Sequence, residues 1–158
     1  MHFPIIELQP HPIPVDERLG DYELYDDACI GYFTDYVGDE YSEEARKVYI
    51  ESGSLQGLLA GIATVDTASE TIVFLDADTI RDTITKHILD SIADLQKEAL
   101  GGRGLRPNDL TYAGDYWRGH EELFYVEGCA HTSGAFISSA IWYAGKTLYI
   151  GAIFDAHI

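Results

Sequence analysis

The most regular pattern of apolar and polar positions lies between residues 79 and 100. Six apolar residues recur there every three or four positions, the spacing of one helix face: Ile80, Ile84, Ile88, Ile92, Leu95 and Ala99. Asp78 or Thr79 is a suitable N-cap, and Gly101 and Gly102 form a typical C-terminal stop. The pattern predicts a long amphipathic helix over about 79–100.

Five shorter apolar runs are bounded by turn residues and predict strands. They are Leu55–Val65, Thr71–Leu75, Glu122–Glu127, Ala135–Tyr143 and Thr147–Phe154. The last two are apolar at nearly every position and are joined by the short turn Ala144–Lys146, which predicts a hairpin of central strands. Ser42, followed by Glu43 and Glu44, predicts the start of a short helix near 42–52.

These elements predict an α+β fold. We expect a mostly antiparallel sheet of about five strands, with the long helix packed on it. The chain of 158 residues fits one hydrophobic core, so we expect a single domain over 1–158. Residues 1–15 contain four prolines and are expected to lie extended along its surface.

The charge of the chain narrows the classes of partner. Twenty-seven acidic residues face ten Lys and Arg, a formal net charge of −17. Such a charge repels nucleic acid and anionic membranes, so we expect direct binding to neither. The sequence contains no run of about 20 apolar residues and no basic signal sequence, which predicts a cytoplasmic protein, in a host cell's cytoplasm if phage- or plasmid-encoded.

Residues 16–51 form an acidic, tyrosine-rich segment with twelve acids, three bases and six tyrosines, a net charge of −9. An acidic surface is also typical of salt adaptation, but that would spread the acids, and 111–158 holds only five. Carboxylates beside tyrosine rings are complementary to a basic nucleic-acid-binding cleft. The predicted partner-binding residues are Asp21, Tyr22, Glu23, Tyr25, Asp26, Asp27, Asp35, Tyr36, Asp39, Glu40, Tyr41, Glu43 and Glu44.

The leading hypothesis is therefore a non-catalytic inhibitor without a cofactor. It would occupy the basic surface of a nuclease or of another nucleic-acid-processing complex. In composition and size the chain resembles DNA mimics such as anti-restriction proteins, anti-CRISPR proteins and nuclease-toxin immunity proteins. A structural subunit is another alternative, in which the apolar C-terminal hairpin pairs at a sheet edge.

Asp76-x-Asp78 at the end of a predicted strand is the second candidate site. It resembles the Asp-x-Asp of nucleotide-sugar glycosyltransferases and the first motif of haloacid-dehalogenase-type phosphatases. That resemblance implies a small hydrolase or transferase that uses Mg²⁺ or Mn²⁺, with Asp115 as a further acid. Too few residues follow Asp76 for the βα units of such folds, so a helix cap and a strand end also explain the motif.

Cys129 and His131, with His87 or His157, are a weaker candidate for a zinc site or a thiol nucleophile. The chain has no Cys-x-x-Cys pair, and no third group is evident that would orient the histidine. We therefore interpret Cys129 and His131 as turn residues, with the thiol partly buried.

Overall fold

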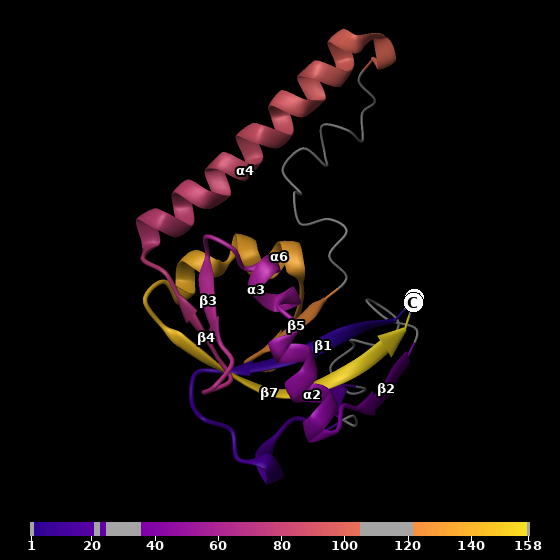
Figure 1. Cartoon of the computed structure of the whole chain (residues 1–158), viewed down its shortest axis with the longest axis vertical. Coiled ribbons are helices and arrows are strands. Elements are labelled where there is room, and N and C mark those ends of the chain that lie inside the picture. Colours follow the sequence, from indigo (N-terminus) through magenta and orange to yellow (C-terminus); the bar gives the residue numbers. More distant parts are fainter. Residues whose placement is uncertain (1, 21–22, 25–35, 105–121, 158) are drawn as a thin grey trace.

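The computed structural model of the chain describes residues 2–20, 23–24, 36–104 and 122–157. Within them, seven strands form one mixed sheet in the order β3-β4-β7-β1-β5-β6, with β2 also beside β7 (Figure 1). Only the β1–β5 pair of this described sheet is parallel. The strands are β1 (His2–Gln9), β2 (Tyr36–Glu40), β3 (Ala63–Asp66), β4 (Thr71–Phe74), β5 (Leu123–Val126), β6 (Cys129–Thr132) and β7 (Thr147–His157).

The α+β class and the mostly antiparallel sheet are confirmed, with more strands than the five predicted. Both predicted helices are present as α2 and α4, and Ser42 caps α2 by accepting the Ala45 N–H. A π-helical turn, η2, continues α4. The helical elements are η1 (Val15–Glu17), α2 (Glu43–Glu51), α3 (Ser54–Leu58), α4 (Ala77–Glu98), η2 (Ala99–Arg103), α6 (Ser133–Ser138) and η3 (Ala140–Tyr143).

Two of the predicted strands are partly or wholly helical. Residues 55–65 form most of α3 and then β3, and residues 135–143 belong to α6 and η3. A short run that is apolar at nearly every position does not distinguish a strand from a helix by its periodicity. The deciding signal is local: the Thr132 hydroxyl accepts the Ala135 N–H and caps α6.

The prolines of the N-terminal segment do not keep it on the surface. β1 lies inside the sheet, between β7 and β5, and Ile5, Ile6 and Leu8 are fully buried. Pro4 precedes the first residue pair of the β1–β5 ladder, Ile5 with Leu123. The other three prolines follow the end of the strand, so a missing N–H is tolerated at each position.

β7 is the central strand and is covered on both sides. β1 pairs along one side of it, while β4 and β2 pair with the two halves of the other side. The structure therefore contradicts the prediction that β7 and residues 135–143 form a hairpin that pairs at a sheet edge. Residues 135–143, the predicted second strand of that hairpin, are helical.

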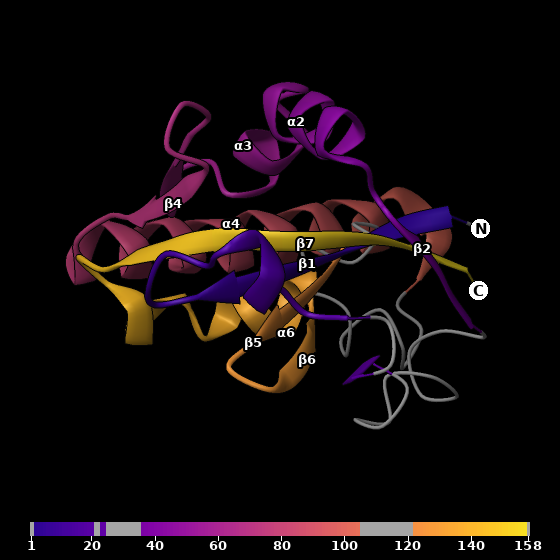
Figure 2. The same ribbon diagram turned by 90° about the horizontal axis from the view of Figure 1, so that it is seen from below.

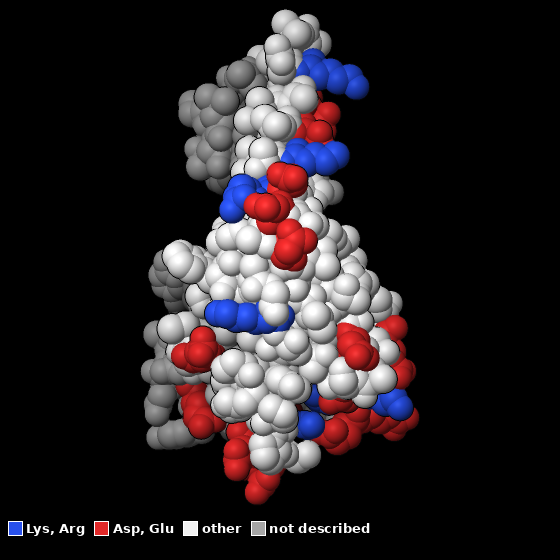
Figure 3. Space-filling model, turned by 90° about the vertical axis from the view of Figure 1, so that its left-hand side faces the viewer, with Lys and Arg blue, Asp and Glu red and all other residues white. Residues whose placement is uncertain are grey.

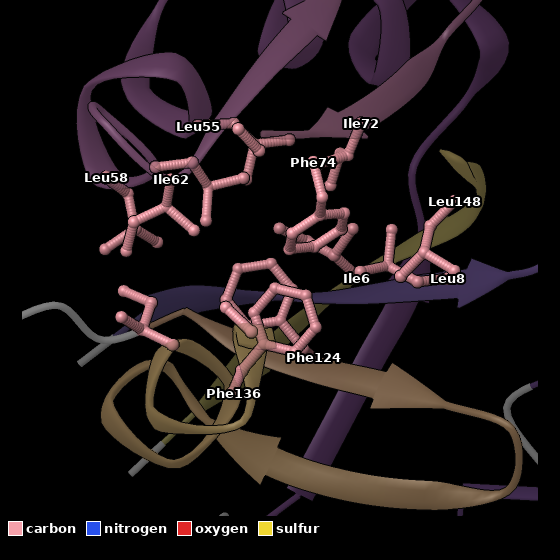
Figure 4. Close-up of a cluster of buried hydrophobic side chains, with 14 of the residues drawn as sticks. Ile6, Leu8, Leu55, Leu58, Ile62, Ile72, Phe74, Phe124, Phe136 and Leu148 are labelled. Atoms are coloured by element: carbon pink, nitrogen blue, oxygen red, sulfur yellow. The ribbon is translucent and has the colours of Figure 1, made fainter. Parts of the chain in front are cut away.

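Apolar side chains are buried on both faces of the sheet. The larger cluster joins the sheet to α3, α6 and the start of α4, and its centre is the stacked ring pair Phe124–Phe136, 4.2 Å apart (Figure 4). The smaller cluster packs Leu19, Leu24 and Val37 against the other face. A bulge in β7 beside Glu7 changes the alternation, so that Ile150 and Ile153 both belong to the larger cluster.

α4 is a helix as predicted, but its stripe does not pack along the sheet. Figure 1 shows it running out from the body, and in the view from below it lies behind the sheet (Figure 2). Only Ile80 of the helix is fully buried. Ile92 and Leu89 are 49% and 59% exposed. The spacing of apolar residues predicts which face of a helix is apolar but not which element lies against it. Among the described residues, no helix combines the length and apolar character needed to span a bilayer.

Candidate functional site

The structure describes the side chains of six of the thirteen predicted partner-binding residues. They are Glu23, Asp39, Glu40, Tyr41, Glu43 and Glu44. Tyr36 begins β2. The other six lie outside the described residues: Asp21, Tyr22, Tyr25, Asp26, Asp27 and Asp35.

β2 and the start of α2 present the described acids. Val37 is buried in the smaller cluster, and Tyr41 donates its N–H to the Ile153 carbonyl, which fixes both ends of this stretch on β7. Asp39 and Glu40 then face solvent. Glu43 and Glu44 occupy the exposed first turn of α2, where the helix dipole favours negative charge.

A second stretch, described at residues 16–20 and 23–24, lies beside this one. Leu19 and Leu24 share the smaller cluster with Val37. Arg18 forms an ion pair with Glu43, which joins the two stretches. Together they expose seven carboxylates, which we call the acidic end: Asp16, Glu17, Glu23, Asp39, Glu40, Glu43 and Glu44.

The bases of the same segment are largely turned inward. Arg46 is fully buried: its Nε and Nη2 donate to the carbonyls of Gly151 and Ile150, and its Nη1 pairs with Glu70 at 2.6 Å. The Arg18 side chain is only 9% exposed and is paired with Glu43. Lys47 remains on the surface near Glu51. Arg18 thus offsets the charge of Glu43, one of the seven carboxylates, whereas Arg46 is paired with Glu70 outside the acidic end.

Exposed acids gather in one part of the molecule. Figure 3 shows Asp and Glu side chains at the end of the body away from α4, while Lys and Arg side chains are interspersed with Asp and Glu along that helix. Because exposed charges act over about a Debye length, roughly 8–10 Å in physiological salt, such a gathering acts as one negative surface.

The two tyrosines of this region whose side chains are described, Tyr41 and Tyr49, are less exposed than the acids. Tyr41 is half-buried, and its ring lies edge-on to Tyr49 at 6.4 Å. Burial, and next the charge of Asp155, raise the pKa of Tyr41, so its hydroxyl keeps its proton as a hydrogen-bond donor. Tyr41 therefore supports the edge of the core and offers a donor beside the carboxylates.

Asp76 and Asp78 are engaged in helix capping. One oxygen of Asp76 accepts the N–H groups of Asp78 and Thr79, and the other accepts the Thr79 hydroxyl at 2.6 Å. Asp76, rather than the predicted Asp78 or Thr79, is thus the N-cap of α4. The hydrogen bonds from Thr79 hold the pKa of Asp76 below its usual value. Asp78 pairs with Arg81 at 2.6 Å.

No metal cluster is formed within the described part of the chain, since no three His, Cys, Asp or Glu side chains come together there. Asp115 lies outside the described residues. Cys129 and His131 are two residues apart on β6, with the Cys129 thiol exposed, not partly buried in a turn. His157 ends β7, three strands away, or about 14 Å at the usual strand spacing, too far to share a zinc ion with them.

Sequence reasoning found the acids of the candidate site but missed the inward pairing of Arg18 and Arg46. Nothing in the spacing of these arginines marks them as buried, because the carbonyls that bind Arg46 lie more than a hundred residues away. The chain matches no family model, no curated protein and no solved structure.

Proposed function

We propose that the protein is a non-catalytic binding protein that docks its acidic end onto the basic surface of a partner. The observation that carries the proposal is the combination of seven exposed carboxylates with two arginines turned inward and paired. Folding exposes the negative charge of this segment and withdraws Arg46, which pairs with Glu70. Such a surface attracts a basic partner and accelerates its association.

The partner that fits this surface is a basic protein that handles DNA or RNA, such as a nuclease or a nucleic-acid-binding complex. Carboxylates would lie where its Lys and Arg side chains normally meet phosphates, so binding would block the nucleic-acid site. The net charge of −17 opposes direct binding of nucleic acid by the chain itself.

The proposal is tested by salt-graded capture from the native host. The intact chain should retain a basic nucleic-acid-binding protein at low salt and release it as salt rises, because exposed charges are screened. Asp39→Asn combined with Glu40→Gln removes two charges from the acidic end and should lower the salt concentration of release. The matched control, Asp82→Asn with Asp94→Asn on α4, removes the same charge elsewhere and should behave as the intact chain.

A partner that both double variants retain equally would contradict the proposal. So would a captured protein that is acidic or that resists high salt. The metal-dependent hydrolase or transferase of Asp76 and Asp78 is a weaker alternative, because the Asp76 oxygens already serve the cap. It requires that Mg²⁺ or Mn²⁺ raise the melting temperature, and that Asp76→Asn abolish the rise.

A further inference from the structure

A second feature of the molecule is a cleft at the N-terminal end of β7. It has a volume of about 400 Å³, within the range of small-molecule sites. Its polar lining residues are Glu127, Tyr143, Lys146, Thr147 and Tyr149. The acidic strand β2 pairs with the C-terminal half of β7, so the cleft and that strand lie toward opposite ends of β7.

The aromatic wall of the cleft is fixed by the core. The Tyr143 ring lies 5.4 Å from Phe74 and 6.0 Å from Phe136. Burial, and then the charges of Glu127 and Cys129, raise the pKa of Tyr143, so the phenol remains a hydrogen-bond donor at neutral pH. Tyr149 is half-buried on β7 and lines the same cleft.

Lys146 is held in position through its backbone. Its N–H donates to the Tyr143 carbonyl and its own carbonyl accepts the Phe74 N–H. Gly145, with φ of 70°, makes the turn that brings the lysine to the cleft. Lys146 forms no ion pair with any described residue, although most other described bases are paired.

Glu127 reaches the cleft from a conformation that is costly for its residue type. It has φ of 48° and, with Gly128, forms the two-residue turn between β5 and β6. Both residues have positive φ, a geometry that favours Asn-Gly or Asp-Gly. Residues held in such disfavoured conformations cluster at functional sites.

The two charges of the cleft are not neutralised by each other. Glu127 and Lys146 line the same hollow, yet no ion pair joins them. A ligand that carries both signs of charge would satisfy both groups at once. Its carboxylate would meet Lys146 and a tyrosine hydroxyl, its ammonium would meet Glu127, and its apolar part would lie against the rings.

From this geometry we propose that the cleft binds a small zwitterion, namely a free α-amino acid with an aromatic or large apolar side chain. The site is separate from the acidic end and is independent of the function proposed for it. In this site Lys146 binds the carboxylate of the amino acid and Glu127 binds its ammonium group.

The test uses three probes of the same ring size: L-phenylalanine, phenylacetate, which lacks the ammonium, and phenethylamine, which lacks the carboxylate. Binding is followed by calorimetry and by the NMR signals of the tyrosine rings. Phenylalanine should perturb the signals of Tyr143 and Tyr149 and bind at least about tenfold more tightly than either half-ligand.

Variants separate the two charges. Lys146→Gln should weaken phenylalanine and phenylacetate about tenfold and leave phenethylamine unchanged. Glu127→Asn should weaken phenylalanine and phenethylamine and leave phenylacetate unchanged. Because Asn adopts positive φ more readily than Glu, this variant should keep or raise the melting temperature, which separates loss of the site from loss of the fold.

Lys47→Gln and Glu51→Gln, an exposed pair on α2, are the matched controls and should leave all three affinities unchanged. The proposal is overturned if phenylalanine leaves the tyrosine signals unperturbed up to its solubility limit. It is also overturned if phenethylamine binds as tightly as phenylalanine, since that would be the general attraction of a cation to an acidic protein.

Discussion

At the scale of single residues, buried side chains stabilise the bulge in β7 by hydrogen-bonding its backbone groups. Glu7 is buried on β1, and its carboxylate accepts the N–H groups of Ala152 at 2.8 Å and Leu19 at 3.0 Å. Arg46 binds the carbonyls of Ile150 and Gly151 in the same stretch of β7. Buried polar groups are tolerated because each has a partner. One buried acid and one buried base thus fix the irregular part of β7.

Gly151 is required at this bulge because a Cβ atom there would overlap the Glu7 carboxylate and crowd Ile13. Gly151→Ala should lower the free energy of unfolding by about 1–3 kcal/mol or more, the cost of overpacking. Gly57→Ala in α3 is the control: no atom lies within 4 Å of its new methyl group, and the helix should gain about 0.5–1 kcal/mol. Urea unfolding measures both, and equal effects would contradict the role given to Gly151.

The lowered pKa of Asp76 predicts that the stability of the fold depends on pH. Its pKa is lowered in the folded chain, first by the Thr79 hydroxyl, from the ordinary value of 3.8. A group with a depressed pKa stabilises the fold above its unfolded pKa, and that contribution is lost as pH falls through the folded pKa. Asp76→Asn keeps a capping side chain that does not titrate.

The melting temperature of the native chain should therefore fall more steeply between about pH 4 and pH 2 than that of Asp76→Asn. Asp82→Asn, which removes an exposed carboxylate without a capping role, should follow the native curve. Parallel curves for the native chain and Asp76→Asn would show that the cap does not depend on ionisation.

At the scale of elements, α4 is anchored by its first turns and extends beyond the body (Figure 1). Ile80→Ala should cost about 2–5 kcal/mol, because this side chain is fully buried in the larger cluster. Ile92→Ala removes a side chain that is 49% exposed and should cost less than about 1 kcal/mol.

Both values come from urea unfolding, and sedimentation of the same samples reports the mass. If Ile92→Ala is as costly as Ile80→Ala, or lowers the mass in solution, another surface covers the projecting part of α4. The arrangement described here would then be incomplete.

Elements could be predicted from the sequence where local signals determine them. Ser42 and the apolar stripe of 80–99 marked α2 and α4 correctly. Residues 135–143 were not predictable as helix, since a short run that is apolar at nearly every position lacks the contrast on which periodicity depends. β1 was missed because prolines are usually excluded from central strands, and only the pairing with β5 shows that Pro4 escapes that rule.

In the candidate site, too, local features could be predicted from the sequence and long-range contacts could not. The acidity of 16–51 is a property of composition and could be read directly. The burial of Arg46 depends on β7, more than a hundred residues away. The cleft of Glu127 and Lys146 is lined by three separate segments of the chain, so neither feature could be inferred from local patterns.

At the scale of the whole molecule, the fold gathers exposed acids at one end of the body (Figure 3). Arg46 of the same segment is buried and paired with Glu70, and α4 carries three bases among five acids. A net charge of −17 works against a compact state, so a surface of this kind is costly to maintain. The proposed docking onto a basic partner gives that surface a use.

The most direct test of this account is the association rate of the captured partner, measured over a range of ionic strength. For the native chain and for the Asp82→Asn/Asp94→Asn control, the rate should fall steeply as salt rises. For Asp39→Asn/Glu40→Gln it should be several-fold slower at low salt and less dependent on salt. Identical rates for the two double variants at every ionic strength would contradict docking through the acidic end.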